Sequence, residues 1–378
     1  MNYFFKVFSD LFPLVVFTST ILFALLSYFL INDLYFFEMV QNYKIFNSFG
    51  LILILIYLFI FSIPFLMRLP TPIIEIKVNQ STILRYALLS FFLALIGNIL
   101  FFRFFYQNPE QLLSWTNNLS VSGFKTSLSE TQIPGITTMT QFAIPSVILF
   151  MILFLKNNYK KSILFFVFVL LFFALARSFF FSERLAIIEL IVPIFVLLTI
   201  FNKISLKKVI FMGMIFLAMI WSFEYFRSYS NYWYAENYNA GSFIINRFFM
   251  YFATTINNFF MVTTYFEFQK YMVDILAPFY QFSQNYSIVG YNNLFKYASP
   301  EFNSPFFFGV IYTNFWIFSP IIVFIISVLT KTSYFNFRRI NFFGIYTFPI
   351  ILLTILDIRI MYLLETRIYF FYFVFLLI

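Results

Sequence analysis

Residues 176–198 read ARSFFFSERLAIIELIVPIFVLL, which joins the end of one long apolar run to the start of the next. Arg177 lies at the end of the first run and Arg184 at the start of the second, with only SFFFSE between them. As helices, apolar runs of about twenty residues match the thickness of the hydrocarbon core of a bilayer. The stretch therefore predicts two membrane-spanning helices joined by a short turn, with both arginines at one membrane surface.

The same pattern extends along the chain, which has 378 residues, 62% of them hydrophobic and 10% charged. A soluble domain carries about 25% charged residues, so the composition excludes a soluble fold and indicates an integral membrane protein. The runs that we interpret as spans are 12–31, 45–67, 83–102, 138–155, 162–176, 185–201, 208–223, 306–330, 340–356 and a shorter 368–378. The predicted fold is one all-α polytopic transmembrane domain over 1–378, with about ten transmembrane helices.

The distribution of charge predicts the orientation of these helices. The chain has 24 Lys and Arg against 15 Asp and Glu, and the basic excess lies in alternate connections between spans. Those connections contain only Asp10 and Glu75 as acids, against Lys6, Arg68, Lys77, Arg85, Lys156, Lys160, Lys161, Lys203, Lys207, Lys208, Lys331, Arg338 and Arg339. Because basic connections stay inside, we expect a cytoplasmic N-terminus. The net charge of +9 then reflects topology, and no nucleic-acid partner is predicted.

This orientation places two polar segments outside, a smaller one over about 103–137 and a larger one over about 222–305. The larger segment begins with many Tyr, Trp and Asn residues, including Tyr232 and Trp233. Such rings suit a saccharide groove, and an interfacial aromatic belt explains several of them equally well. Its apolar part, 242–266, is predicted to be an interfacial or re-entrant helix, because a full crossing would reverse the charge bias of the later connections.

The chain contains no Cys and no His. Disulfides, thiolate nucleophiles, Cys/His zinc sites and Ser-His-Asp triads are therefore excluded, as is any reaction in which imidazole is the base. Chemistry must instead use Arg, Lys, Asp, Glu, Tyr or Ser, and no metal site is evident in the sequence.

The outer arginines are the candidate binding groups. Arg177 and Arg184 form a candidate pyrophosphate clamp, since Arg binds phosphate oxygens bidentately and a helix N-terminus favours anions. The alternative is that arginines at span ends simply extend to the interface. Ser182 is expected to cap the helix that begins near Arg184. Glu189 lies inside the apolar span on a different face, and we expect it to meet a partner on another helix, for structural or chemical reasons.

Three segments, SERLAIIELIVPIFVLL, EYFRSYSNYW and FIINRFFMYFATTINN, resemble the O-antigen and capsule polymerases, which are oligosaccharide repeat-unit polymerases of the Wzy type. The resemblance covers the whole chain in layout, with a small Arg-bearing outer loop followed by a large outer loop with more Arg. Arg177 and Arg184 resemble the small-loop arginines, and Arg227 and Arg247 those of the large loop. The R-x10-G pattern of some members is absent, which leaves open which Arg has which role.

The resemblance implies transfer of a growing glycan from its undecaprenyl pyrophosphate carrier to a lipid-linked repeat unit, on the outer face of a bacterial cytoplasmic membrane. The product would be O-antigen or capsular polysaccharide. No nucleotide sugar and no tightly bound cofactor are implied, and a chain-length regulator is a possible partner.

The chemistry of this transfer indicates which residues to expect at the site. A departing pyrophosphate needs fixed cations and an acceptor hydroxyl needs a base. The expected catalytic residues are Arg184 and Arg247, with Glu183, Glu224 or Glu236 as the base. The expected substrate-binding residues are Arg177, Arg227, Tyr232, Trp233 and Arg367.

Three other classes of protein fit the layout less well. A ligase that passes glycan to lipid A shares it, but that family typically uses an outer-loop His, and this chain has none. A different transferase that uses a lipid-linked phosphosugar stays an open alternative. A repeat-unit flippase or other transporter would have short loops on both sides and more charges inside its spans. In a purely structural membrane protein the outer arginines would be incidental.

Overall fold

The structure is a computed structural model that describes 11–30, 44–67, 69–107, 110, 137–156, 159–181, 183–201, 204, 207–208, 211–215, 218, 239–265, 304, 306–359, 363 and 366–378. All regular secondary structure in those ranges is helical, which confirms the all-α prediction. The longer helices are α2 (Phe12–Leu30), α4 (Ser48–Leu66), α5 (Gln80–Phe101), α9 (Ala143–Leu155), α10 (Leu164–Phe181), α11 (Arg184–Ile200), α14 (Ala240–Tyr265), α18 (Ser319–Arg338), α19 (Phe342–Leu356) and α20 (Thr366–Leu377). The shorter ones are α6 (Arg103–Gln107), η1 (Thr137–Phe142), η2 (Lys161–Ile163), α17 (Phe307–Phe315) and η5 (Trp316–Phe318).

Six helical segments are long and apolar enough to cross a membrane, and α11, α19 and α20 are shorter apolar helices. The six segments are Phe12–Leu30, Ser48–Leu66, Gln80–Phe101, Thr138–Leu155, Lys161–Phe180 and Phe307–Arg338. Large apolar side chains point outward from them: Phe165, Phe168 and Phe172 of α10 are 64%, 66% and 67% exposed. Residues at this spacing share one helix face, and such a face would be unfavourable in water. The surface of α10 therefore suits a lipid environment.

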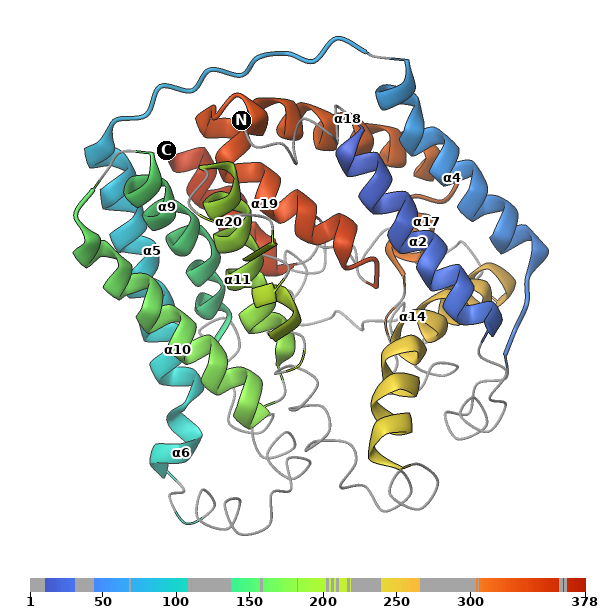
Figure 1. Cartoon of the computed structure of the whole chain (residues 1–378), viewed down its shortest axis with the longest axis horizontal. Helices are drawn as coiled ribbons and strands as arrows, with labels where there is room; N and C mark the ends of the chain where they lie inside the picture. Colours follow the sequence, from blue (N-terminus) through green and yellow to red (C-terminus); the bar gives the residue numbers. More distant parts are fainter. Residues whose placement is uncertain are drawn as a thin grey trace, which may run out of the picture.

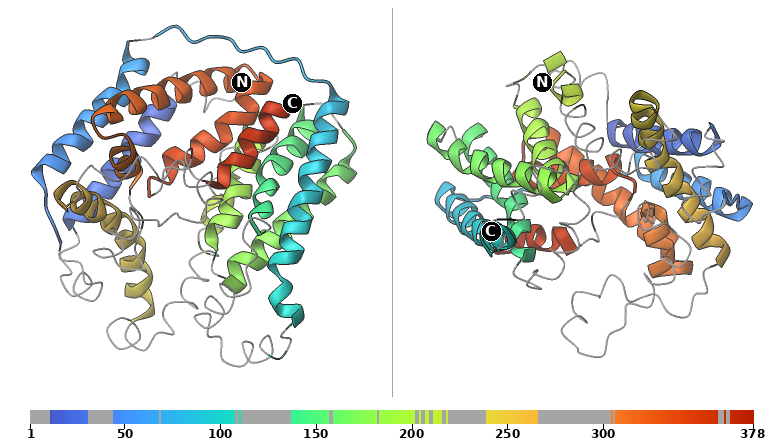
Figure 2. Two further views of the ribbon diagram at one scale, coloured as in Figure 1. Left: turned by 180° about the vertical axis from the view of Figure 1, so that it is seen from behind. Right: turned by 90° about the horizontal axis from the view of Figure 1, so that it is seen from below.

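The helices form two groups that α19 connects (Figures 1 and 2). One group contains α5, η1, α9, α10 and α11, and Thr138–Leu155 at its centre is 83% buried. The other group contains α2, α4, α14, α17 and α18. α19 contacts α11 in the first group and both α18 and α2 in the second. Its close approach to α18 requires Gly344, because a Cβ there would lie 2.0 Å from the Phe337 backbone nitrogen.

An extended segment, 69–79, joins α4 to α5 across one end of both groups (Figure 1). The C-terminal half of α18 holds this segment in place. Lys331 Nζ donates to the Leu69 carbonyl at 2.8 Å, and the Asn336 side chain accepts a hydrogen bond from the Ile74 amide at 2.9 Å. These contacts bind the connection between the two groups to a helix of the second group.

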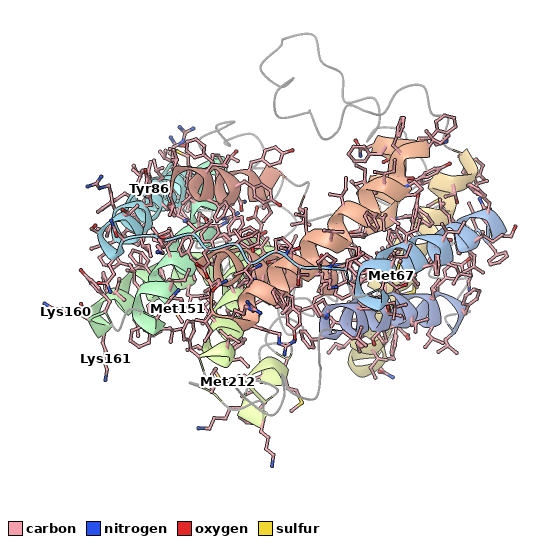
Figure 3. The ribbon with its side chains drawn as sticks, turned by 90° about the horizontal axis from the view of Figure 1, so that it is seen from above. Met67, Tyr86, Met151, Lys160, Lys161 and Met212 are labelled. Atoms are coloured by element: carbon pink, nitrogen blue, oxygen red, sulfur yellow. The ribbon has the colours of Figure 1, made fainter. Side chains whose placement is uncertain are left out.

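Three of the connections that were predicted to be cytoplasmic, those near 69–79, 156–161 and 331–341, meet at this end. Lys156, which follows α9, donates to the carbonyl of Ile340 in the turn between α18 and α19. Figure 3 shows Lys160 and Lys161 projecting outward from the same region. We call this the inner end, because the positive-inside rule predicts that it faces the cytoplasm, and we call the opposite end the outer end. The cytoplasmic N-terminus and the number of ten spans stay predictions.

The structure divides the predicted span 306–330 into α17, η5 and α18. Phe306 and Trp316 have φ angles of 70° and 40°, which residues other than glycine adopt only at an energetic cost. The Phe306 amide donates to the Arg359 carbonyl at 3.0 Å. The start of α17 is therefore attached to the segment that follows α19.

Helix α14 covers the segment that was predicted to lie along the outer surface, and it is not among the helices apolar enough to cross a membrane. Its C-terminal part binds the start of α4: Asn257 accepts from the Ile45 amide at 2.8 Å, and Asn47 donates to the Thr264 hydroxyl at 2.9 Å. The Thr255 hydroxyl donates to a carbonyl of its own helix, a bond that tends to bend helices. Figures 1 and 2 show α14 curved, with both of its ends away from the inner end.

Candidate functional site

Arg177, at the C-terminal end of α10, is a buried residue with 7% of its surface exposed. Its guanidinium forms an ion pair with Glu183, the residue before α11, and Nε donates to the carboxylate at 2.9 Å. The guanidinium carbon lies 4.7 Å from the centroid of the Phe101 ring of α5. Arg177 is therefore fixed both to the start of the next helix and to a neighbouring helix.

Glu183, and not Ser182 as predicted, is the N-cap residue of α11. Its side chain makes no capping hydrogen bond, because the carboxylate binds Arg177. The Ser178 hydroxyl donates to the Glu183 carbonyl at 3.1 Å and closes the turn between the two helices. The predicted pyrophosphate clamp changes in one respect, because the Arg177 guanidinium already has a carboxylate partner. The side chain of Arg184 lies outside the described residues.

A cavity of about 10 Å³ lies beside Arg177, between α5, η1, α9, α10 and α11. Its polar lining consists of Asn98, Thr140, Arg177 and Glu189, all of them buried. Glu189 thus borders the same cavity as groups from other helices, and its contact with a partner on another helix stays a prediction. This volume is close to the minimum that one water molecule requires, and it is far too small for a sugar ring. The cluster therefore places its own polar side chains near the outer end, and its cavity does not hold a glycan.

Close packing of α5 against η1 creates this cluster. A Cβ on Gly97 would lie 2.5 Å from the Thr140 backbone nitrogen, so only glycine permits the approach. The Thr140 hydroxyl is buried and has no hydrogen-bond partner among the described residues. A water molecule in the adjacent cavity would provide one.

A second cluster lies in the other helix group. Arg247 of α14 is fully buried within the chain, and its predicted place at the level of the lipid headgroups stays a prediction. Its guanidinium carbon lies 5.3 Å from the centroid of the Tyr251 ring, and that of Arg359 lies 5.5 Å from the same centroid. Arg359 also binds Asp357 through two hydrogen bonds of 2.7 Å. The ring of Tyr251 thus brings together guanidiniums from α14 and from the segment after α19.

Asp357 and Arg359 are not among the predicted site residues. They belong to residues 357–367, DIRIMYLLETR, a segment predicted to lie outside, and only Arg367 of it was predicted to bind substrate. The available signal was an acid and an Arg two residues apart directly after an apolar run. Nothing in that pattern indicates a contact with α14, because the two segments are distant in the sequence.

The other predicted site residues cannot be placed by their side chains. Arg184 and Arg367 lie in α11 and α20, but their side chains are outside the described part of the structure. The remaining predicted residues lie wholly outside it: Glu224, Arg227, Tyr232, Trp233 and Glu236.

These features define a helical, membrane-embedded protein with two clusters of buried and half-buried Arg and acidic residues, each on a different helix group. No protein-family model, no curated protein and no solved structure matches the chain. Within the described ranges, no group of three or more potential metal ligands occurs. Any function for these clusters is therefore argued from their own chemistry.

Proposed function

We propose that the chain is a glycosyltransferase that polymerises lipid-linked oligosaccharide repeat units on the outer face of a bacterial cytoplasmic membrane. The main support is that Arg247 and Arg359 lie over one tyrosine ring, close to the Asp357 carboxylate. Charged groups buried in a membrane protein are costly and commonly mark a substrate site. Arg is the side chain best suited to phosphate oxygens, and the proposed donor carries a diphosphate.

In the proposed reaction the donor is a glycan on undecaprenyl pyrophosphate and the acceptor is a lipid-linked repeat unit. The bond from the anomeric carbon to the pyrophosphate oxygen breaks, and a bond from that carbon to an acceptor hydroxyl oxygen forms. The pyrophosphate leaves with the electron pair, so guanidiniums near it would stabilise the developing charge. The acceptor proton passes to a carboxylate. Atoms and charge balance without a nucleotide sugar or a cofactor.

The two clusters support different roles in this reaction. Arg247 and Arg359 are the preferred cations for the diphosphate, because two guanidiniums from separate segments converge there. Arg177 is bound to Glu183 in a closed turn, which suits it to positioning the start of α11 and hence Arg184. Since the Glu183 carboxylate is engaged, Glu224 and Glu236 are better candidates for the base than Glu183.

The assignment is tested by deleting the protein in its bacterial host and separating the surface glycolipids on a gel. A polymerase mutant should display lipid that carries a single repeat unit in place of a ladder of lengths. An unchanged ladder would rule out the polymerase assignment.

A transporter of lipid-linked repeat units is the second candidate, and one observation favours it. Arg177 and Glu189 line a water-sized cavity between helices, and buried charges of this kind occur along the pathways of transporters. The same gel separates the two functions. Without a transporter no repeat unit reaches the surface, whereas without a polymerase single repeat units still do.

A further inference from the structure

The inner end contains a larger cavity, of about 300 Å³, which is separate from both Arg clusters. It lies between the extended segment 69–79, the start of α5, the end of α9 and the start of α19. Its polar lining is Lys77, Asn79 and Lys156, and its apolar lining includes Ile83, Ile152 and Phe342. The volume is within the range of sites that bind small molecules, about 300–1,000 Å³.

The charged residues of this lining are both cationic. In the described part of the chain, neither Lys77 nor Lys156 forms a salt bridge with a carboxylate. Lys156 donates to the uncharged Ile340 carbonyl at 3.1 Å, and its ammonium group has further hydrogens to donate. Glu75 precedes Lys77 in the same segment but is not part of the lining. Two like charges that border one cavity favour an anion between them.

The start of α5 adds to this preference for an anion. Asn79 is the N-cap residue of α5, and its side chain makes no capping hydrogen bond. Backbone amides in the first turn of a helix favour negative charge. Partial burial also lowers the pKa of Lys156, and an anion bound beside it would oppose that effect.

We propose that this cavity binds the phosphate group of an anionic phospholipid from the inner leaflet. Lys77 and Lys156 would hold the phosphate, and Ile83, Ile152 and Phe342 would contact the glycerol and the first acyl carbons. Basic pockets between membrane helices on the cytoplasmic side suit anionic headgroups. The apolar half of the lining favours a lipid over free phosphate. This site is independent of the proposed glycosyltransferase activity.

The test uses purified full-length protein in detergent, with phosphatidylglycerol, phosphatidylcholine and inorganic phosphate as separate probes. The variant Lys77→Gln/Lys156→Gln removes both cavity charges. The matched control Lys160→Gln/Lys161→Gln removes two charges from the same end, where Figure 3 shows both side chains projecting outward. Native mass spectrometry measures the lipid that each protein retains. A second variant, Lys77→Arg/Lys156→Arg, keeps the charge.

We expect phosphatidylglycerol to bind about 30-fold more weakly to the double Gln variant, and to keep its affinity in the control and in the double Arg variant. Phosphatidylcholine should bind weakly to all four proteins. Equal phosphatidylglycerol affinity in the wild type and the double Gln variant would overturn the proposal, as would an equal loss in the control. If inorganic phosphate binds as tightly as phosphatidylglycerol and the double Gln variant loses both, the assignment to a lipid is wrong.

Discussion

The backbone nitrogen of Thr140 occupies the space that a side chain on Gly97 would need, since a Cβ at that position would lie only 2.5 Å from it. The same contact brings η1 and α5 together at the cavity beside Arg177. Arg177, which forms the ion pair between α10 and α11, therefore borders a cavity whose other wall depends on a close backbone approach between two other elements.

Replacing Gly97 by Val should displace η1 and destabilise the protein. Overpacking a filled core costs about 1–3 kcal/mol, and a collision with backbone atoms cannot be relieved by a change of rotamer. Thermal unfolding in detergent measures the effect. The control is Gly213→Ala, since a Cβ there meets nothing within 4 Å and Ala favours a helix. A similar fall in Tm for both variants would contradict the argument.

Glu183→Gln should destabilise the turn between α10 and α11, because Arg177 would lose its charged partner in a buried setting. Breaking a buried pair costs about 3–5 kcal/mol, and we expect about 1–3 kcal/mol because Glu183 is partly exposed. Glu75→Gln, which removes an exposed acid, is the control. Chemical denaturation of Arg177→Gln, Glu183→Gln and the double variant Arg177→Gln/Glu183→Gln completes a double-mutant cycle. Additive losses would mean that the two side chains are not coupled.

Arg247→Lys and Arg184→Lys should each reduce polymerisation about 100-fold or more while the protein still inserts into the membrane. Lysine keeps the charge but lacks the planar fork that binds two phosphate oxygens at once. The ladder of glycan lengths and the amount of protein in the membrane are measured together. Arg85→Lys, at an exposed position of α5, should leave both unchanged. Full activity in both Lys variants would contradict a phosphate-binding role for Arg247 and Arg184.

Tyr251→Phe should retain activity, whereas Tyr251→Leu should lose most of it. The aromatic face of residue 251 contacts both Arg247 and Arg359, and phenylalanine preserves that face. A cation over an aromatic ring is stabilised by about 0.5–2 kcal/mol, and here two cations depend on one ring. Equal activity of the two variants in the same glycan assay would show that the ring does not hold the arginines in place.

Lys331→Met should release segment 69–79 from α18. Lys331 donates to the carbonyls of Pro64 and Leu69, and hydrogen bonds from charged donors contribute about 1.5–3 kcal/mol each. The Lys77 side chain is already exposed, but local opening should free the backbone around it, so cleavage there by trypsin should become about tenfold faster. Lys161→Met, at an exposed lysine of the same end, is the control. Unchanged cleavage at Lys77 in Lys331→Met would contradict this role.

The helices themselves were largely predictable, because apolar runs end where polar residues begin. The predicted spans 185–201 and 340–356 correspond to Arg184–Ile200 and Phe342–Leu356. The interruption at Trp316 had one signal in the sequence, Pro320 in the first turn of α18, whereas the positive φ of an aromatic residue has none. The Ser319 hydroxyl donates to the Trp316 carbonyl and pairs with the Tyr57 hydroxyl of α4, which connects this turn to another helix.

The two Arg clusters differ in how far the sequence could predict them. Arg177 and Glu183 flank one short turn, so their proximity follows from local geometry, although the turn was expected to leave Arg177 available. The proximity of Arg247 to Arg359 depends on how α14 packs against a distant segment. The positive-inside rule placed Arg247 near the membrane surface. That rule counts the basic residues in each connection and says nothing about which face of a helix other helices cover.

The extended segment 69–79 limits how the two helix groups can move relative to each other. The segment runs extended between α4 and α5, and a chain spans at most about 3.3–3.6 Å per residue, so its length limits how far the two helices can separate. The inner ends of the groups cannot separate without breaking its bonds to α18. Motion that admits or releases a bulky substrate must therefore pivot about the inner end and widen only toward the outer end.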